Sequence, residues 1–194
     1  MNINQHKVIL ASASPRRREL LSQVGVEYVV IPSQCEEVIC STIPSEVVMQ
    51  LSRDKAMDVA DNSETGTIII GADTVVAVDN KILGKPADEE EAFNMIAGIR
   101  NRAHSVYTGV TVIYHGNEGN VIRTFYNETR VFVYDMTDDE IREYIATKEP
   151  MDKAGAYGIQ GRFAAYIEKI EGDYNNVVGL PVSALLYEIK KMEE

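Results

Sequence analysis

The stretch Thr67–Val78, TIIIGADTVVAV, is the longest apolar run of the chain and sets the expected fold class. Its β-branched residues predict two buried strands, Thr67–Ala72 and Thr74–Val78, with Asp73 at the strand end where the pattern breaks. The run is too short to span a bilayer, and Asp73 interrupts it. We therefore expect buried strands in the middle of a soluble domain.

Strand and helix patterns alternate on both sides of this run. Further strands are expected at Lys7–Ala11, Val26–Ile31, Ser105–Tyr114, Val121–Tyr134 with a break, and Phe163–Ile170. Helices are expected at Pro15–Val24, Pro44–Ala60, Ala87–Ile99, Asp138–Thr147 and Pro181–Met192. Long neighbouring strands in the middle favour a mixed sheet over a purely parallel one. Because no repeat or linker interrupts the pattern, residues 1–194 are expected to form a single α/β domain with flanking helices.

Local signals sharpen several of these boundaries. Thr137 and Glu140 predict a capping box, and the acidic run Asp88–Glu91 predicts a favourable helix start. Asp79-Asn80 predicts a tight turn, and residues 115–120, HGNEGN, predict another.

The composition limits the possible partners. The net charge is −11, from 19 Lys and Arg against 30 Asp and Glu, with 45% hydrophobic residues. We expect neither a nucleic acid polymer nor a membrane as partner, because both need a broad basic surface. Cys35 and Cys40 form one C-x4-C pair without a second pair, which indicates reduced thiols rather than zinc. With no signal peptide apparent, a cytoplasmic protein is expected.

The stretch Ser12–Leu20, SASPRRREL, places positive charge where a helix disfavours it. Ser14 is a good N-cap and Pro15 suits the first helical position. The three arginines that follow then lie in the first turn, where a cation typically loses about 0.3–1 kcal/mol. Such a turn is also an anion site, since its free N–H groups and dipole attract phosphate. A bound anion would offset the cost of the arginines.

Asp73, Glu37 and Lys85 are candidates for chemistry, each with a commoner alternative. Asp73 at a strand end could hold a divalent cation or accept a proton from water; the alternative is a turn aspartate bound to local N–H groups. Glu37, in an acidic pair after a strand, could reach a metal but such pairs are usually solvated. Lys85 lies in a stiff Gly-Lys-Pro loop, although exposed lysines beside turns are common.

The stretch Glu149–Gly161, EPMDKAGAYGIQG, has a glycine at every third position from Gly155. It matches neither the dinucleotide pattern nor a Walker loop. Gln160 both donates and accepts hydrogen bonds, as reading a base edge requires. The alternative is a structural loop whose glycines need positive φ. The later stretch Gly172–Pro181, GDYNNVVGLP, is interpreted as scaffold.

The inventory points to a polyphosphate and a divalent metal rather than to a covalent nucleophile. No G-x-S-x-G elbow or recognisable histidine arrangement is present. Clamped phosphates, a metal-polarised water and a carboxylate base suffice to hydrolyse an anhydride. The residues that could supply these functions are Arg16, Arg17, Lys55, Lys85, Glu37 and Asp73.

Taken in order, the motifs SASPRRRELL, GADTVV, GKP, EPMDKAGAYGIQG and NVVGLP resemble those of the Maf family of nucleoside triphosphate pyrophosphatases. The resemblance runs from Ala11 to Pro181. It implies a mixed sheet with two lobes around a central cleft, and cleavage of a nucleoside triphosphate to the monophosphate and pyrophosphate. Thr74 and the loop with Gln160 resemble the branch that acts on dTTP and UTP, and differ from the branch for methylated GTP.

The resemblance also assigns roles residue by residue. It implies that Asp73 accepts the proton of the attacking water, with Glu37 as its partner for Mg²⁺ or Mn²⁺. The resemblance further implies a homodimer. Arg17, Thr74 and Gln160 resemble specificity positions, and the phosphate contacts are Ser12, Arg16, Lys55 and Lys85.

Two alternatives stay open. The same site would serve a nucleotide-binding regulator of septum formation that does not turn over its ligand. A purine-selective pyrophosphatase of the inosine triphosphatase type is a further alternative, against which Thr74 and Gln160 argue.

Overall fold

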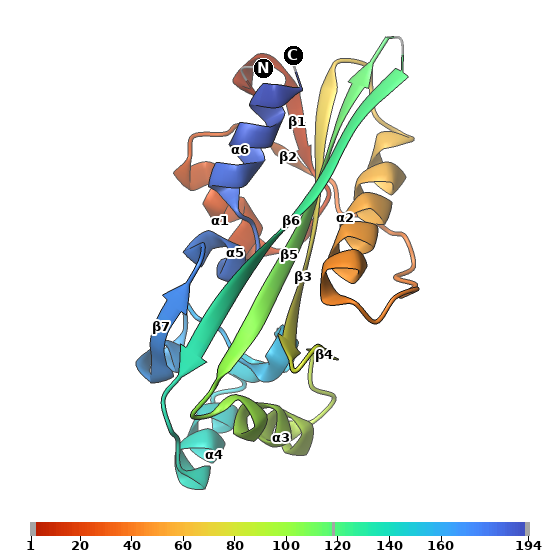
Figure 1. Ribbon diagram of the computed structural model, residues 1–194. Helices are drawn as coiled ribbons and strands as arrows, with labels where there is room; N and C mark the ends of the chain where they lie inside the picture. Colours follow the sequence, from red (N-terminus) through yellow and green to blue (C-terminus); the bar gives the residue numbers. More distant parts are fainter. Residues whose placement is uncertain (1–2, 118, 193–194) are drawn as a thin grey trace.

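A computed structural model describes residues 3–117 and 119–192, which form a mixed seven-stranded sheet with helices on both faces (Figure 1). The sheet order is β2-β1-β3-β5-β6-β7, and β4 pairs with β3. β1 runs parallel to β2 and β3, whereas the other pairings are antiparallel, so the predicted mixed α/β sheet is confirmed. The strands are β1 Lys7–Leu10, β2 Val29–Val30, β3 Thr67–Val78, β4 Lys81–Leu83, β5 Ala103–Gly116, β6 Gly119–Val133 and β7 Ile167–Glu171.

The helices cover the two faces of the sheet and its far end. In Figure 1, α2 lies on one side of the long strands, α1 and α6 lie on the other, and α3 and α4 pack together at the lower end. The α-helices are α1 Pro15–Gln23, α2 Pro44–Ala60, α3 Glu89–Ile99, α4 Asp138–Ala146, α5 Tyr174–Val178 and α6 Val182–Lys191. The short 3-10 helices are η1 Ile3–Gln5, η2 Glu149–Asp152, η3 Ala154–Ala156 and η4 Arg162–Tyr166. Within these described residues, no helix is long and apolar enough to cross a membrane.

β3 is one uninterrupted strand, so the prediction that Asp73 stands at a strand end is wrong. Asp73 lies in mid-strand, paired with Gly109 of β5. The β-branched residues on both sides of Asp73 continue the strand because both faces of β3 are covered. Ile69 packs with Ala56 of α2, whereas Ile68 belongs to the cluster on the α1 side.

Gly71 lies within β3 and allows α2 to pack closely against the strand; it does not form a turn. A Cβ at this position would lie 2.3 Å from the Ser52 carbonyl oxygen and 2.8 Å from the Ala56 Cβ, so only glycine lets α2 approach β3 this closely. The apparent break of the apolar pattern therefore marks a helix contact on a continuous strand.

Other boundaries differ more modestly. β6 has no break, β2 is shorter than predicted, and β7 begins at Ile167 because Phe163, predicted to lie in that strand, packs in the core from η4. The scaffold stretch contains the short helix α5, and β4 was not predicted.

The local signals agree with the structure where it can be described. The Thr137–Glu140 capping box is present, and Asp88 caps α3 by accepting a hydrogen bond from the Glu91 N–H. Asp79 and Asn80 adopt φ of 50° and 62° in the predicted tight turn. The other predicted turn, 115–120, includes residue 118, which lies outside the described residues.

Candidate active site

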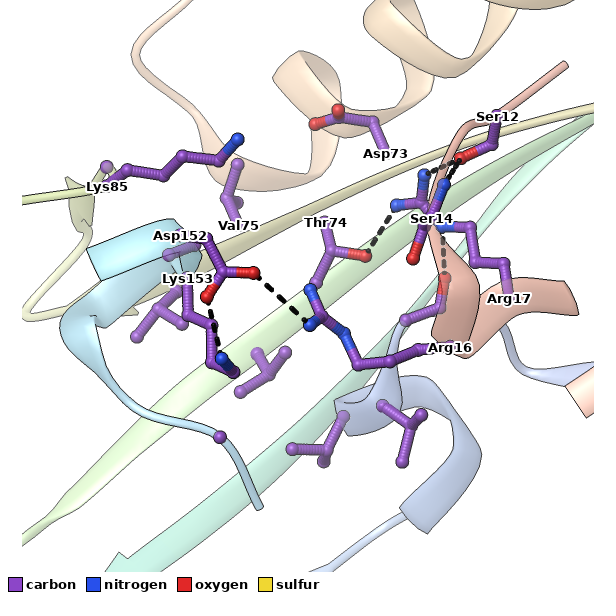
Figure 2. A pocket seen from close by; sticks show the side chains of 18 of the residues that line it. Ser12, Ser14, Arg16, Arg17, Asp73, Thr74, Val75, Lys85, Asp152 and Lys153 are labelled. Carbon is purple, nitrogen blue, oxygen red and sulfur yellow. Dashed lines mark hydrogen bonds and ion pairs between the residues drawn. The ribbon is translucent and has the colours of Figure 1, made fainter. Parts of the chain in front are cut away.

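A cavity of about 990 Å³ opens between the start of α1, the middle of β3 and the stretch Glu149–Gly161 after α4, here called the glycine-rich loop (Figure 2). Segments far apart in the sequence form its walls, including the chain after β2 and the loop after β4. Every residue predicted for the site lines this one cavity: Ser12, Arg16, Arg17, Glu37, Lys55, Asp73, Thr74, Lys85 and Gln160.

Arg17 joins three walls of the cavity. Its guanidinium donates hydrogen bonds to the Ser12 Oγ at 2.9 Å, the Thr74 Oγ1 at 3.1 Å and the Gly179 carbonyl oxygen at 2.8 Å (Figure 2). Burial lowers the pKa of Arg17, and the nearby carboxylate of Asp73 only partly opposes this. Arg17 thus holds Ser12 and Thr74 in a fixed relation.

Arg16 keeps its charge at the cavity surface. Its side chain is 37% exposed, and its guanidinium nitrogen lies 3.8 Å from a carboxylate oxygen of Asp152. Lys153 donates to the same carboxylate at 2.7 Å (Figure 2). Arg18 is exposed and, within the described residues, is not part of the cavity lining.

Ser14 stands at the N-cap of α1 as predicted, with Pro15 as the first helical residue. Its side chain, however, makes no capping hydrogen bond, so that part of the prediction is wrong. The local bond instead runs from the Ser14 backbone N–H to the Ser12 Oγ, over 3.3 Å. The Ser12 hydroxyl thus accepts from both Ser14 and Arg17.

Lys55 lies between two carboxylates. Its ammonium nitrogen is 2.6 Å from the Asp73 Oδ1 and 2.7 Å from the Glu37 Oε1. Burial alone would lower the pKa of Lys55, but the two carboxylates raise it overall. The hydrogen bond from Lys55 lowers the pKa of Glu37, against the effect of burial, and Lys85 adds to the lowering.

The two carboxylates fit a divalent cation that arrives with a phosphate ligand. Asp73 and Glu37 already converge on one positive charge, that of Lys55. Within the described residues, no group of three or more His, Cys, Asp and Glu side chains could hold a metal by itself. Mg²⁺ is usually bound by one or two carboxylates together with water and substrate phosphates, so two carboxylates suffice.

The loop that carries Lys85 is tied to the glycine-rich loop. The Gly155 N–H donates to the Gly84 carbonyl oxygen at 3.0 Å. Gly155 has a φ of 68°, and a Cβ there would lie 2.9 Å from Val76 of β3. The structural interpretation of this loop therefore holds for Gly155, but Gly158 and Gly161 do not have positive φ. Gln160 is exposed and lines the cavity.

Sequence reasoning missed some of the cavity wall. Asp152 and Lys153 belong to the stretch Glu149–Gly161 and line the cavity, although the sequence gives neither a specific role. The carbonyl of Gly179, in the stretch interpreted as scaffold, holds Arg17. No residue type signals a backbone acceptor, so this contact could not be predicted.

Residues 7–192 match the protein family described as Maf-like protein. The chain belongs to the Maf family. It is 52% identical over 187 residues to the dTTP/UTP pyrophosphatase of Lachnoclostridium phytofermentans, an alignment that covers 96% of this chain and 95% of that protein. It is 50% identical over 187 residues to the protein of the same name from Thermoanaerobacter sp. strain X514, covering 96% of each. The Bacillus cereus ATCC 10987 protein of that name is 47% identical over 189 residues, covering 97% of this chain and 91% of its own length.

Proposed function

We propose that this Maf-family protein hydrolyses dTTP and UTP to the nucleoside monophosphate and pyrophosphate. Its similarity to dTTP/UTP pyrophosphatases extends over nearly the whole chain. The observation that carries the proposal is the convergence of the nine predicted residues, from six separate segments, on one cavity.

The cations of the cavity bind the phosphates. Arg16, Lys55 and Lys85 come from three segments, and the N-terminal turn of α1 adds its N–H groups and dipole. The Ser12 hydroxyl is a further contact. Two opposite charges 4 Å apart attract by about 1 kcal/mol in water and about 4 kcal/mol at an effective dielectric of 20. Several such contacts outweigh the cost of stacking arginines at a helix start.

Asp73 is the base for the attacking water. The water oxygen bonds to phosphorus as the bond to the pyrophosphate oxygen breaks, and the water proton passes to the Asp73 carboxylate. Pyrophosphate leaves with the bonding electron pair. Lys55, 2.6 Å from Asp73, orients the carboxylate and faces the same cavity as the phosphates.

A divalent cation would be held by Asp73 and Glu37. When bound, it supplies charge neutralisation to the phosphates and polarises water. We propose Mg²⁺ or Mn²⁺. Chelation followed by addition of each metal separately tests this, because the ion that restores pyrophosphate release at low concentration identifies the cofactor.

Base recognition is assigned to Thr74, Arg17 and Gln160. Arg17 fixes the Thr74 hydroxyl from one side, and the Thr108 hydroxyl lies 2.9 Å from it on the other. Gln160 reaches the cavity from the glycine-rich loop with both a donor and an acceptor. A pyrimidine edge also presents both.

Further parts of the proposal concern the whole protein. A single domain is supported by one apolar cluster that includes residues from Ile3 to Ile189. A cytoplasmic location is supported by the two free cysteines, Cys35 and Cys40. The homodimer rests on the family resemblance, and sedimentation analysis tests it.

Pyrophosphate release from a panel of dTTP, UTP, CTP, ATP and GTP tests the proposed function. We expect dTTP and UTP to be cleaved with the highest kcat/KM. Preference for a purine would instead favour the inosine triphosphatase type. Tight binding of dTTP without any release of pyrophosphate would favour the regulatory alternative.

A further inference from the structure

The turn that carries Gln160 is held at both ends by side chains. The Tyr144 hydroxyl accepts a hydrogen bond from the Gly158 N–H at 3.2 Å. The Glu149 Oε2 accepts one from the Arg162 N–H at 3.1 Å. The Tyr144 hydroxyl also donates to the Glu149 Oε1 at 2.9 Å, so the two side chains form one connected support.

This support is rigid at its base. Tyr144 projects from α4, is 3% exposed and packs against Phe163, with ring centroids 5.1 Å apart. Burial, with the bond to Glu149 as a second cause, raises the pKa of Tyr144. The hydroxyl therefore stays protonated near neutral pH and keeps the proton that it donates to Glu149. Hydrogen bonds to a charged acceptor are the stronger kind.

Gly161 gives an independent sign that Glu149 shapes this turn. A Cβ at Gly161 would lie 1.9 Å from the Glu149 Oε1 and 2.3 Å from its Cδ. The φ of Gly161 is −98°, outside the left-handed region that favours glycine, so the missing side chain makes room for the Glu149 carboxylate. The turn also closes on itself, since the Gly161 N–H donates to the Gly158 carbonyl oxygen at 3.1 Å.

We propose that Tyr144 and Glu149 are positioning residues that set base selectivity by holding the turn that carries Gln160. This inference rests on the proposed function of the site. Tyr144 is absent from the cavity lining within the described residues, so it acts through the turn and not on the ligand. Glu149 lines the cavity and bonds to Tyr144 and to the backbone of the turn.

The test compares pyrimidine with purine substrates in Tyr144→Phe and Glu149→Gln. For dTTP we expect kcat/KM to fall about tenfold in each variant, mainly through KM, which corresponds to about 1.4 kcal/mol. Tyr144→Phe removes both hydrogen bonds of the hydroxyl, and Glu149→Gln replaces one acceptor oxygen by an amide donor. For GTP, whose base Gln160 is not proposed to recognise, kcat/KM should stay within about twofold of the wild-type value. The ratio of the two values therefore falls about tenfold.

Tyr166→Phe is the matched control. Tyr166 packs against the same Phe163, with centroids 5.7 Å apart, but holds neither end of the turn. Its selectivity ratio should equal that of the wild type. Melting temperatures of all variants show whether each remains folded.

Gly161→Ala provides a second route that keeps both supporting side chains. Its added methyl displaces Glu149, so it should lower the selectivity ratio as Glu149→Gln does. In the double variant Tyr144→Phe/Glu149→Gln the loss should be smaller than the product of the single losses, because the two residues act as one unit.

Equal loss for dTTP and GTP, or an unchanged ratio in folded Tyr144→Phe and Glu149→Gln, would overturn this proposal. It would leave the proposed function intact, because that depends on the wild type alone. If the wild type releases no pyrophosphate, the proposed function fails instead. In that case the effect of the turn on base selectivity is measured from the dissociation constants of dTTP and GTP. The preference for dTTP over GTP should again fall about tenfold in each variant.

Discussion

Lys55 forms ion pairs with both carboxylates of the site and is also a proposed phosphate contact. It contacts Asp73 on β3 and Glu37 on the chain after β2, which brings two separate segments to one charge. An ammonium has three donors, so phosphate can join these carboxylates without displacing both. The same residue therefore orders the site before binding and contributes to binding itself.

Asp73→Asn tests the assignment of the base. The amide has the shape of the carboxylate but cannot take the proton from water, so we expect kcat to fall about 10²–10⁴-fold. Binding of an α,β-imido analogue of dTTP, measured by calorimetry, should persist. Turnover near the wild-type level would remove Asp73 from this role.

His104 of β5 is 3% exposed and contacts Tyr157 of the glycine-rich loop. Its Nε2 is 2.7 Å from the Tyr157 hydroxyl, next to Gly158 in the chain. Burial, together with the charge of Arg102, lowers the pKa of His104 from 6.5 to about 4. The folded protein therefore keeps this imidazole neutral at a pH where the unfolded chain would protonate it.

Stability should consequently fall as the pH drops from about 6.5 towards 4, because the unfolded state binds the additional proton. Between pH 7 and pH 5, His104 alone should reduce the free energy of unfolding by about 2 kcal/mol. Urea unfolding of the wild type and His104→Gln at both pH values measures this. Identical pH dependence in the two proteins would contradict the assignment.

Among the elements, β3 matters most, because its middle carries both Asp73 and Thr74. β3 pairs with β5 without interruption from Ile68 to Ala77. Both side chains therefore project from a continuous, hydrogen-bonded part of the strand, where the sequence had suggested a break. A group on a central strand is held more firmly than one on a loop.

Gly71→Ala should destabilise the protein, because the added Cβ would meet α2 at 2.3 Å. Overpacking of this kind typically costs about 1–3 kcal/mol. Gly98→Ala is the control, since Gly98 lies in α3 with nothing within 4 Å of an added Cβ. It should stabilise by up to about 1 kcal/mol. Denaturant unfolding of both variants measures the difference, and equal free energies of unfolding would contradict the packing argument.

Elements with strong local signals were predicted well, and those shaped by packing were not. α2 has the bounds that its pattern predicts, and the capping box of α4 is present. The strand end predicted at Asp73 is wrong because a polar residue in an apolar run usually marks the end of a buried strand. Here the strand continues, and the Asp73 side chain lines the cavity. Phe163 misled because an apolar run does not distinguish a strand from a buried 3-10 turn.

Across the whole molecule, a chain with a net charge of −11 gathers its site cations from distant segments. Arg16, Lys55 and Lys85 meet in one cavity although they lie on α1, α2 and the loop after β4. The residue types and the family resemblance together predicted which side chains would gather. The network of Arg17 was not predictable, because it depends on the Gly179 backbone carbonyl and on the packing of α1 against α5.

The central claim is that the positive start of α1 binds the phosphates of a pyrimidine triphosphate. Arg16 tests it more cleanly than Arg17, whose side chain also holds three walls of the cavity together. Arg18, in the same turn but exposed, is the matched control.

The decisive measurement is the affinity for the α,β-imido analogue of dTTP, by calorimetry, in Arg16→Ala and Arg18→Ala. The account predicts that Arg16→Ala weakens binding by about tenfold or more, whereas Arg18→Ala stays within about twofold of the wild type. An Arg16→Ala protein that binds the analogue as tightly as the wild type, or equal weakening by both variants, would contradict it.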